Sequence, residues 1–205
     1  MSQNTQAPTP FRAPGTDRQP PDPLERIARE LLRELGEDPE REGLLGTPAR
    51  WARWWREFTD YEPGTVETVF ESASSTETVS VSGIEVWSLC EHHLLPFSCQ
   101  VTIGYRPQGQ VLGLSKFARI AHQHAHRLQL QERLTSDIAD AVAKLTASAD
   151  VAVLCRGEHL CMAMRGIRTP ATMTTVTWRG AFADPAVRAE FLALQPPAAA
   201  GAGPR

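Results

Sequence analysis

The chain has 205 residues and a formal net charge of −3, which indicates one domain with flexible ends, or at most two small domains. This charge gives no global attraction to nucleic acid or to an anionic membrane surface, so neither partner is expected. No window approaches the roughly 18 apolar residues that a membrane span needs, and the first residues lack the apolar segment of a secretory signal. Four cysteines are too few for a disulfide scaffold, so we expect a cytoplasmic protein with reduced thiols.

The two ends differ in composition from the middle of the chain. Residues 1–23 are rich in proline and almost free of apolar side chains, which predicts a disordered arm. Residues 196–205 are Pro, Ala and Gly with a terminal Arg, which predicts a flexible tail. Between them we expect a single domain at 24–195, made of a helical region at 24–60 and a sheet-and-helix core at 76–195.

The helical region carries two predicted helices. Apolar residues at helical spacing from Leu24 to Leu35 predict the first, which Gly36 would end. Thr47-Pro48 predicts the start of the second, with Thr47 as N-cap and Pro48 at the first helical position. One side of this helix is aromatic, which is typical of a core or a subunit interface. The aromatic residues are Trp51, Trp54, Trp55 and Phe58.

In the core, period-two alternation predicts strands, and helical spacing predicts three helices. Val79 and Val81 predict a first strand, and Ile84 and Val86 predict a second that runs into Cys90, with a bulge or a tight turn at Gly83 between them. The other expected strands lie at 99–105, about 150–165 and 171–178. Three helices are expected. The first begins near Ser115, the second covers Leu134 to Leu145, and the third begins at Asp184-Pro185. This order predicts an α+β fold with an antiparallel sheet.

Two short segments carry the strongest chemical signal. Cys-Glu-His-His at 90–93 and His-Leu-Cys at 159–161 offer thiols and imidazoles, which are zinc ligands. A structural zinc takes four protein ligands, whereas a catalytic zinc takes three and leaves one position to water. We therefore predict a catalytic zinc, the alternative being a structural site to which His159 adds the fourth ligand. The three expected ligands are Cys90, His93 and Cys161.

The histidines left over are acid–base candidates. His92 and His159 would stay free of the metal, and each can exchange a proton near neutral pH. If 159–165 continues as a strand, then His159, Cys161 and Arg165 share one face of it. The opposite face would pack against apolar neighbours through Leu160, Met162 and Met164.

A cationic segment precedes them in the chain. Ser115, as the expected N-cap, would begin a helix whose free N–H groups can hold an anion. Lys116 and Arg119 flank the same helix and, with Arg165, would form a cradle for phosphates. The alternative is a solvated, charged helix start. The chain contains no GxxxxGK[ST] and no GxGxxG motif.

Two further features have open interpretations. Glu132 either accepts hydrogen bonds from a guanine edge or is a helix-start acid favoured by the helix dipole. His122 and His126 have metal-like spacing, but no thiol or acid accompanies them nearby. We interpret them, with His124, as surface or interface histidines.

Four motifs follow one another in a specific order. They are Cys-Glu-His-His from 90, Gly-Leu-Ser-Lys-x-x-Arg from 113, Gln-x-Gln-Glu-Arg-Leu-Thr from 129 and His-x-Cys-Met-x-Met-Arg-Gly from 159. With Thr-Pro-x-Arg from 47, this combination resembles the GTP cyclohydrolase I family over about 24–195. The resemblance implies a tunnelling fold, in which two long antiparallel helices back an antiparallel sheet behind an N-terminal helical region.

The resemblance also implies an assembly and a reaction. Subunits would join their sheets into rings, and two pentameric rings would stack into a homodecamer with active sites at subunit interfaces. Such joining fits the exposed edges of a small sheet, which need covering. GTP and water would give 7,8-dihydroneopterin triphosphate and formate, the first step of folate and tetrahydropterin biosynthesis.

The resemblance further assigns residue roles. Zn²⁺ on its three ligands would activate water for attack on guanine C8. His92 would donate a proton to the imidazole ring nitrogen of guanine, and His159, oriented by Gln131, would act at the ribose ring oxygen. Glu132 would hold the guanine edge, and Ser115 would assist the ribose rearrangement. The triphosphate would be held by Ser115, Lys116, Arg119, Arg165 and, from a neighbouring subunit, Arg50.

One position departs from the family pattern. Arg156 stands where we expect an acidic residue.

Two other functions are alternatives to this reaction. One is a non-catalytic nucleotide-binding scaffold on the same fold with a structural zinc. Loss of His92 or His159 would be its mark in the sequence. The other, the nitrile reductase branch of the fold, relies on a cysteine nucleophile and lacks this zinc set.

Overall fold

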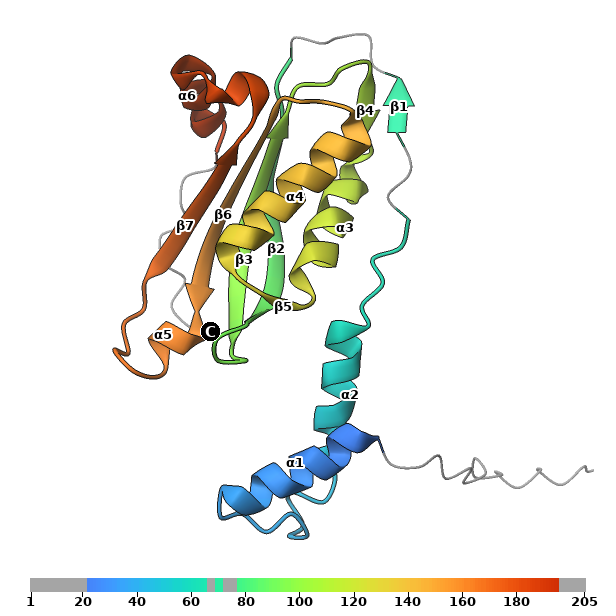
Figure 1. Ribbon diagram of the computed structural model, residues 1–205, viewed down its shortest axis with the longest axis vertical. Helices are drawn as coiled ribbons and strands as arrows, with labels where there is room; N and C mark the ends of the chain where they lie inside the picture. The colour runs from blue at the N-terminus through green and yellow to red at the C-terminus, as the bar shows by residue number, and fades with distance from the viewer. Residues whose placement is uncertain (1–21, 66–68, 72–76, 196–205) are drawn as a thin grey trace, which may run out of the picture. The chain divides into compact units, whose positions relative to one another are not determined.

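The computed structural model describes residues 22–65, 69–71 and 77–195, so most of the predicted arm and the whole predicted tail lie outside the described residues. The chain separates into two compact units, one ending at Arg56 and the other beginning at Glu57. Figure 1 shows the elements in chain order. Within the described residues, no helix is long and apolar enough to cross a bilayer.

In the first unit, helix α1 (Pro23–Glu34) starts one residue before the predicted position. Asp22 sets this start, because its carboxylate accepts a hydrogen bond of 2.9 Å from the backbone N–H of Leu24. The guanidinium of Arg56 donates to both oxygens of the same carboxylate, at 2.9 and 3.1 Å. The cap therefore also joins the two helices of this unit.

Helix α2 (Thr47–Thr59) begins at Thr47 itself. The backbone N–H of Arg50 bonds to the carbonyl of Gly46 at 3.1 Å, so Gly46 precedes the first turn and the prediction of Thr47 as N-cap is wrong. The aromatic side is present, since Trp51 and Trp55 make an edge contact at 5.7 Å between ring centroids.

Five strands form the main sheet of the second unit, in the order β5-β2-β3-β6-β7. Their bounds are β2 (Val79–Cys90), β3 (Pro96–Tyr105), β5 (Leu128–Gln129), β6 (Val151–His159) and β7 (Thr172–Trp178). All neighbours are antiparallel except the short β2–β5 pair. A two-stranded sheet joins β1 (Val69–Glu71) to β4 (Gln110–Leu112). The predicted α+β fold with a mainly antiparallel sheet is confirmed.

The interruption of the first long strand is a bulge rather than a turn. The β2–β3 register shifts between Val81 and Ile84, and Gly83 lies between them with φ +77°. Glycine suits this left-handed backbone because it has no Cβ. One strand therefore runs continuously from Val79 to Cys90 and delivers Cys90 to the end of the sheet.

Two antiparallel helices cover one face of the sheet, α3 (Leu114–Ala125) and α4 (Gln131–Thr146) (Figure 1). Every second residue of β3 faces them, and full burial of each large apolar side chain contributes about 1.5–3 kcal/mol. The β3 residues on this face, all buried, are Phe97, Cys99, Val101, Ile103 and Tyr105. They pack with helix residues such as Ile120, Leu134 and Ile138.

The other face of the sheet is partly covered by the C-terminal elements η1 (Gly180–Ala183) and α6 (Pro185–Ala193). Asp184 caps α6 by accepting a 2.7 Å hydrogen bond from the N–H of Ala186, as the Asp-Pro pair predicts. Phe182 and Phe191 are fully buried there. Helices thus cover both faces, and α3 and α4 extend to the end that carries the cysteine–histidine motifs (Figure 1).

The predicted strand at 150–165 is too long. β6 ends at His159, and Leu160–Ala163 forms one helical turn, α5, closed by a 3.0 Å bond from the N–H of Met164 to the carbonyl of Leu160. The prediction that alternate residues from 159 to 165 share strand faces is therefore wrong. The three side chains expected to pack in an apolar layer are instead exposed. Leu160 and Met162 are each 37% exposed, and Met164 is 58% exposed.

Candidate active site

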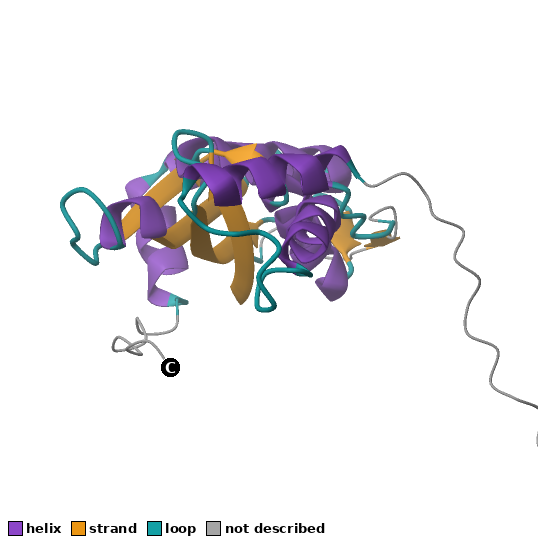
Figure 2. Ribbon diagram, turned by 90° about the horizontal axis from the view of Figure 1, so that it is seen from below, coloured by secondary structure: helices purple, strands orange, loops and turns teal. Residues whose placement is uncertain are grey.

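The cysteine–histidine motifs meet at one end of the sheet, which Figure 2 views from below. Cys90 is the last residue of β2, His93 lies in the turn to β3, and Cys161 lies on α5. Their ligand atoms all lie within 4.8 Å of one another. No other group of three or more potential ligands of this kind occurs among the described residues.

The turn after β2 is shaped by hydrogen bonds to Cys90. The N–H groups of His93 and Leu94 both bond to the carbonyl of Cys90, at 3.3 and 2.8 Å, and the N–H of Cys90 bonds to the carbonyl of Leu95. Leu94 takes φ +57°, an unfavourable backbone for a residue with a Cβ. Such strain is concentrated at functional sites and here brings His93 back towards Cys90.

Two thiols and one imidazole are a donor set that suits Zn²⁺, with a fourth position left for water or substrate. Cys90 is buried, Cys161 is half-buried and His93 is exposed, so the cluster opens to solvent on the histidine side. Burial raises the pKa of the Cys161 thiol, and the neighbouring Cys90 raises it further while Arg165 opposes the rise. Zinc would displace these thiol protons when it binds.

His159 is held beside the cluster by a different set of contacts. Its Nε2 lies 2.9 Å from Oε1 of Gln131. Its ring stacks on Phe97, with 4.5 Å between centroids and 6° between planes. His159 is not part of the ligand cluster, which leaves it available as the predicted acid–base residue.

The orientation of the Gln131 amide follows from its other partners. Its nitrogen lies 3.1 Å from the carbonyl of Cys155, 3.0 Å from that of Met173 and 3.2 Å from the hydroxyl of Thr175. Carbonyls only accept, so this end of the amide is the NH₂ group and the other end is the oxygen. His159 therefore donates to Gln131 through Nε2–H, and its Nδ1 is not used in this bond.

Burial lowers the pKa of His159, and the carboxylate of Glu132 opposes that change. Glu132 is exposed in the first turn of α4, next to Gln131. His92 is also exposed, and its Nδ1 lies 4.0 Å from the sulfur of Cys90. Within a single chain, this end of the sheet thus brings together the three zinc-type ligands, both predicted acid–base histidines and the predicted guanine-binding acid.

An ion pair joins the metal-binding turn to the start of α4. The guanidinium of Arg133 donates to both oxygens of Glu91, at 2.8 and 3.1 Å. This guanidinium lowers the pKa of Glu91. The backbone N–H of Glu91 also bonds to the carbonyl of Gln129 at 3.2 Å. The turn with His92 and the helix with Gln131 are therefore linked directly.

The predicted phosphate-binding residues of α3 lie elsewhere. Ser115 lines a shallow groove with Ser80, Val81, Ser82 and Ile84, in the first half of β2, whereas Cys90 is at its end. The six residue steps of strand from Ile84 to Cys90 span about 20 Å. One chain therefore does not bring Ser115, Lys116 and Arg119 together with Arg165, and the predicted cradle is not formed within it. Ser115 is also not the N-cap, which is Gly113.

The cations of α3 bind a segment that precedes β1. Nζ of Lys116 donates to the carbonyl of Thr65 at 2.7 Å, and Nη1 of Arg119 donates to that of Pro63 at 2.9 Å. Lys116 is buried, and the Gly64 between the two carbonyls has φ +78°. Arg50, in the other unit, donates to the hydroxyl of Thr47 at 3.1 Å.

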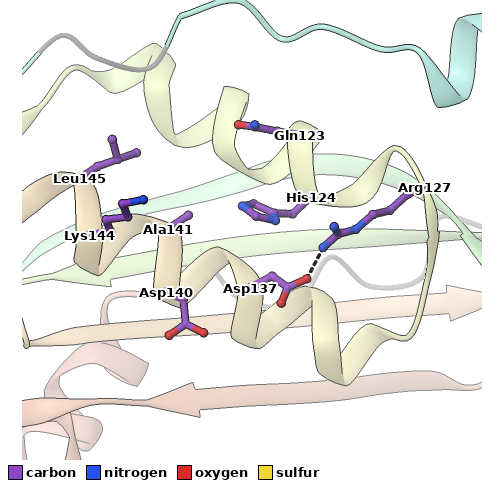
Figure 3. A pocket seen from close by; sticks show the side chains of 8 residues that line it. All are labelled: Gln123, His124, Arg127, Asp137, Asp140, Ala141, Lys144 and Leu145. Carbon is purple, nitrogen blue, oxygen red and sulfur yellow. Dashed lines mark hydrogen bonds and ion pairs between the residues drawn. The ribbon is translucent and has the colours of Figure 1, made fainter.

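The three histidines of α3 occupy a mixed environment. His126 stacks on Tyr61 at 3.9 Å, and the buried Nδ1 atoms of His122 and His124 have no hydrogen-bond partner among the residues that the structure describes. His124 lines a groove between α3 and α4 together with Arg127, from the connection between the helices, and charged residues of α4 (Figure 3). Arg127 and Asp137 form an ion pair across this groove. None of the residues that line this groove belongs to the zinc-type cluster.

Comparison with known proteins connects this geometry to a family. A sequence model of GTP cyclohydrolase I matches residues 24–195. The chain belongs to the GTP cyclohydrolase I family. It is 48% identical to GTP cyclohydrolase 1 of Deinococcus radiodurans over 178 residues, covering 84% of this chain and 82% of that protein. It is 53% identical to GTP cyclohydrolase 1 of Corynebacterium glutamicum over 174 residues, covering 81% and 88%.

One solved structure is similar to part of the chain. The archaeosine synthase QueF-Like, in the apo form, aligns with a TM-score of 0.41 at 20% identity, covering 52% of this chain and 96% of its own.

Several residues of this GTP cyclohydrolase I family member that surround His159 were missed by the sequence reasoning. Phe97 and Thr175 look like ordinary strand residues, and the backbone carbonyls that orient Gln131 have no sequence signature. Gly157 leaves the space for the amide oxygen of Gln131, which a Cβ at that position would overlap. Glu91 and Arg133 could have been noticed, because both lie inside the quoted motifs.

Proposed function

We propose that this chain hydrolyses GTP at C8 of the guanine ring, releasing formate and giving 7,8-dihydroneopterin triphosphate. Its membership of the GTP cyclohydrolase I family supports this reaction. The observation that carries the proposal is the placement of the Cys–His–Cys cluster beside His159, a half-buried imidazole fixed by Gln131. A purely structural zinc would have no need for such an oriented imidazole.

The side chains at the sheet end would divide the work of binding and proton transfer. Cys90, His93 and Cys161 would hold Zn²⁺, which supplies Lewis-acid activation of water when bound. His92, exposed beside the cluster, would donate a proton to a nitrogen of the opening imidazole ring. His159 would donate at the ribose ring oxygen, while its contacts to Gln131 and Phe97 keep the ring in place.

The guanine would be recognised from the start of α4. The ionised carboxylate of Glu132 accepts hydrogen bonds only, which suits the N1–H and 2-amino donors of a guanine edge. It lies next to Gln131, and its charge acts on His159, so a base held there would be close to the proton donor.

A neighbouring subunit would complete the triphosphate site. Within one chain, Ser115, Lys116 and Arg119 are at the opposite end of β2 from the zinc-type cluster. A homo-oligomer that joins sheets edge to edge would bring this helix start next to Arg165 and the cluster of the next subunit. We propose the homodecamer of two stacked pentamers that the family resemblance favours, with Arg50 also supplied by a neighbour.

The remaining assignments are part of the same proposal. Residues 24–195 would act as one cyclohydrolase domain, with the arm at 1–23 and the tail at 196–205 outside the chemistry. All four cysteines are free in the structure, which suits a reducing cytoplasm. The product would feed folate or tetrahydropterin synthesis.

The test is formate release from GTP by purified, zinc-loaded protein, together with pterin fluorescence after oxidation. Equal amounts of formate and pterin are expected. Formate without pterin would indicate that C8 hydrolysis occurs and ring closure fails, which would implicate the ribose end of the site. Absence of formate from folded protein with zinc bound would contradict the proposal and favour a non-catalytic nucleotide-binding scaffold.

A further inference from the structure

A chain of hydrogen bonds runs from His159 to the edge strand β7 and closes on Gln131. Nε2 of His159 lies 2.9 Å from Oε1 of Gln131, and the amide nitrogen of Gln131 lies 3.2 Å from Oγ1 of Thr175. Oγ1 of Thr175 lies 2.6 Å from Oγ1 of Thr135. The hydroxyl of Thr135 donates to the backbone carbonyl of Gln131 at 2.7 Å.

Each bond in this chain has one chemically allowed direction. Thr135 uses its only hydroxyl proton on the Gln131 carbonyl, so its oxygen accepts from the hydroxyl of Thr175. The oxygen of Thr175 then accepts from the Gln131 amide, whose two hydrogens are shared between this oxygen and two backbone carbonyls. A flipped amide would turn its oxygen towards two backbone carbonyls and lose the acceptor for His159, which is costly in a buried position.

The surroundings leave this network little freedom. Gln131 and Thr135 are each 1% exposed, and Thr175 is half-buried on β7. Thr175 lies directly opposite Cys155 in the β6–β7 register, so the strand pairing places the hydroxyl and the Cys155 carbonyl around the same amide nitrogen. The orientation of the amide therefore depends on β7 as well as on its own helix.

We propose that Thr175 is a positioning residue for the reaction, which holds the Gln131 amide in the orientation that accepts a hydrogen bond from His159. The inference rests on the proposed function, because it assigns Thr175 a part in the turnover of GTP. Thr175 is not among the residues proposed to bind GTP or zinc, so it would act only through Gln131 and His159.

Two substitutions separate the hydroxyl from the shape of the side chain. In Thr175→Val a methyl group replaces the hydroxyl, and carbon cannot remain 2.6 Å from the Thr135 oxygen, since non-bonded carbon atoms pack at about 3.5–4.0 Å. The methyl group would also replace the acceptor 3.2 Å from the Gln131 amide nitrogen, so we expect the amide to be displaced. Thr175→Ser keeps the hydroxyl. Thr177→Val is the matched control, because Thr177 lies two residues along the same face of β7 and makes no hydrogen bond to Gln131.

The kinetic test measures formate release from GTP by the zinc-loaded, full-length variants. Thr175→Val is expected to lower kcat by about 10- to 100-fold, the scale of a misplaced catalytic group, with little change in KM. Thr175→Ser and Thr177→Val are expected to stay close to the parent. A Thr175→Val enzyme with the parent kcat would overturn the proposal, as would a Thr175→Ser enzyme as impaired as the valine variant.

A second kinetic comparison tests the route of the effect. In a Gln131→Leu background the amide is absent, so Thr175→Val is expected to cause no further loss of kcat. A full, additive loss in that background would show that Thr175 acts by another route and would overturn the proposal. Thr175→Ala, which inserts no second methyl, replaces the valine variant if that variant does not fold.

A structural measurement separates this proposal from the proposed reaction. In a crystal structure of the Thr175→Val protein, the contact between His159 Nε2 and Gln131 Oε1 is expected to be broken. An unchanged 2.9 Å contact would overturn the positioning role even in a protein that turns over GTP. A parent protein that releases no formate would overturn the reaction, whatever this crystal structure shows.

Discussion

The imidazole of His159 lies flat against the ring of Phe97, with 4.5 Å between centroids and 6° between planes. The two residues are directly opposite each other in the β3–β6 register, at the end of both strands. Phe97 is fully buried, so its ring shields one face of the imidazole from water. The stack and the Gln131 bond together leave the histidine a single orientation at the mouth of the site.

This stack leads to a prediction for Phe97→Leu. Burial lowers the pKa of His159, so removing the flat ring should admit water and move that pKa upward, towards its ordinary value. The limb of the pH–rate profile that reports His159 should shift to higher pH, and kcat should fall by about tenfold. The measurement is kcat and kcat/KM for formate release as a function of pH.

Phe117→Leu is the control for this prediction. Phe117 is equally buried in the same core but contacts Tyr105 rather than His159. Both variants should lose on the order of 1–2 kcal/mol of stability, and only Phe97→Leu should move the pH profile. Equal shifts in both variants would mean that the core, and not the stack, controls His159.

Removal of one zinc-type ligand should separate chemistry from folding. Cys161→Ser is expected to abolish formate release and to lower zinc affinity by more than the ~10- to 100-fold that changes outside the ligand set cause. The fold should persist, because Cys161 lies on a short, partly exposed turn at the edge of the main core. Zinc content by mass spectrometry and thermal unfolding would be measured alongside activity.

Cys155→Ala supplies the comparison. Cys155 is fully buried in β6 outside the cluster, and burial raises the pKa of its thiol to about 11, so the thiol is neutral near pH 7. The Cys155→Ala protein should keep its zinc and its activity per folded molecule. A Cys161→Ser protein that lost only stability, with unchanged activity per folded molecule, would contradict the catalytic assignment.

The sequence was sufficient for features that depend on residue type and short spacing. Cys90 and His93 are close in the chain, and the motif at 159–161 supplies the third ligand, so the cluster could be predicted without knowing the fold. Alternation in β3 predicted its buried face because a period of two has one structural meaning over a long strand.

Other features depend on where distant segments meet. Alternation after His159 covers too few residues to distinguish a strand from one helical turn, and the turn is set by backbone bonds to Met162 and Leu160. The separation of Ser115 from the zinc end depends on the direction of β2, which residue patterns do not give. The ring of hydrogen bonds through Thr175 depends on strand register, so it could not be predicted from the sequence either.

The histidines of α3 predict a dependence of stability on pH. Burial lowers the pKa of both His122 and His124, and Asp137 opposes the change at His124. A histidine whose folded pKa is depressed favours folding above its unfolded pKa of about 6.5, and this contribution is lost as pH falls through the folded pKa. The free energy of unfolding should therefore decrease as the pH falls from neutral into the acidic range.

The test compares the melting temperature at neutral and mildly acidic pH for the parent and for a variant carrying His122→Gln and His124→Gln. The variant should show the shallower decrease. Both proteins are loaded with zinc, so protonation of the metal ligands affects them equally. Identical slopes would mean that these buried histidines do not contribute to the acid sensitivity.

The Glu91–Arg133 ion pair should matter for turnover and very little for stability. Both side chains are partly exposed, and such surface pairs contribute little to folding. Glu91 nevertheless lies between Cys90 and His92, and Arg133 follows the residues that orient His159 and face the guanine. Glu91→Gln and Arg133→Gln are each expected to lower kcat by about tenfold, because a small displacement of the turn moves His92 relative to the substrate.

A double-mutant cycle and a neighbouring pair make this prediction specific. The variant with both substitutions should be no slower than either single one, since the same interaction is lost once. Arg179→Gln breaks the ion pair with Asp140, which also anchors α4 but lies past the end of β7 that is remote from His159, and it should leave formate release unchanged. Additive losses, or an equal loss in Arg179→Gln, would show that general weakening of α4 causes the effect. A non-additive loss confined to Glu91 and Arg133 would establish that this bridge holds the metal-binding turn in register with the helix that carries Gln131 and Glu132.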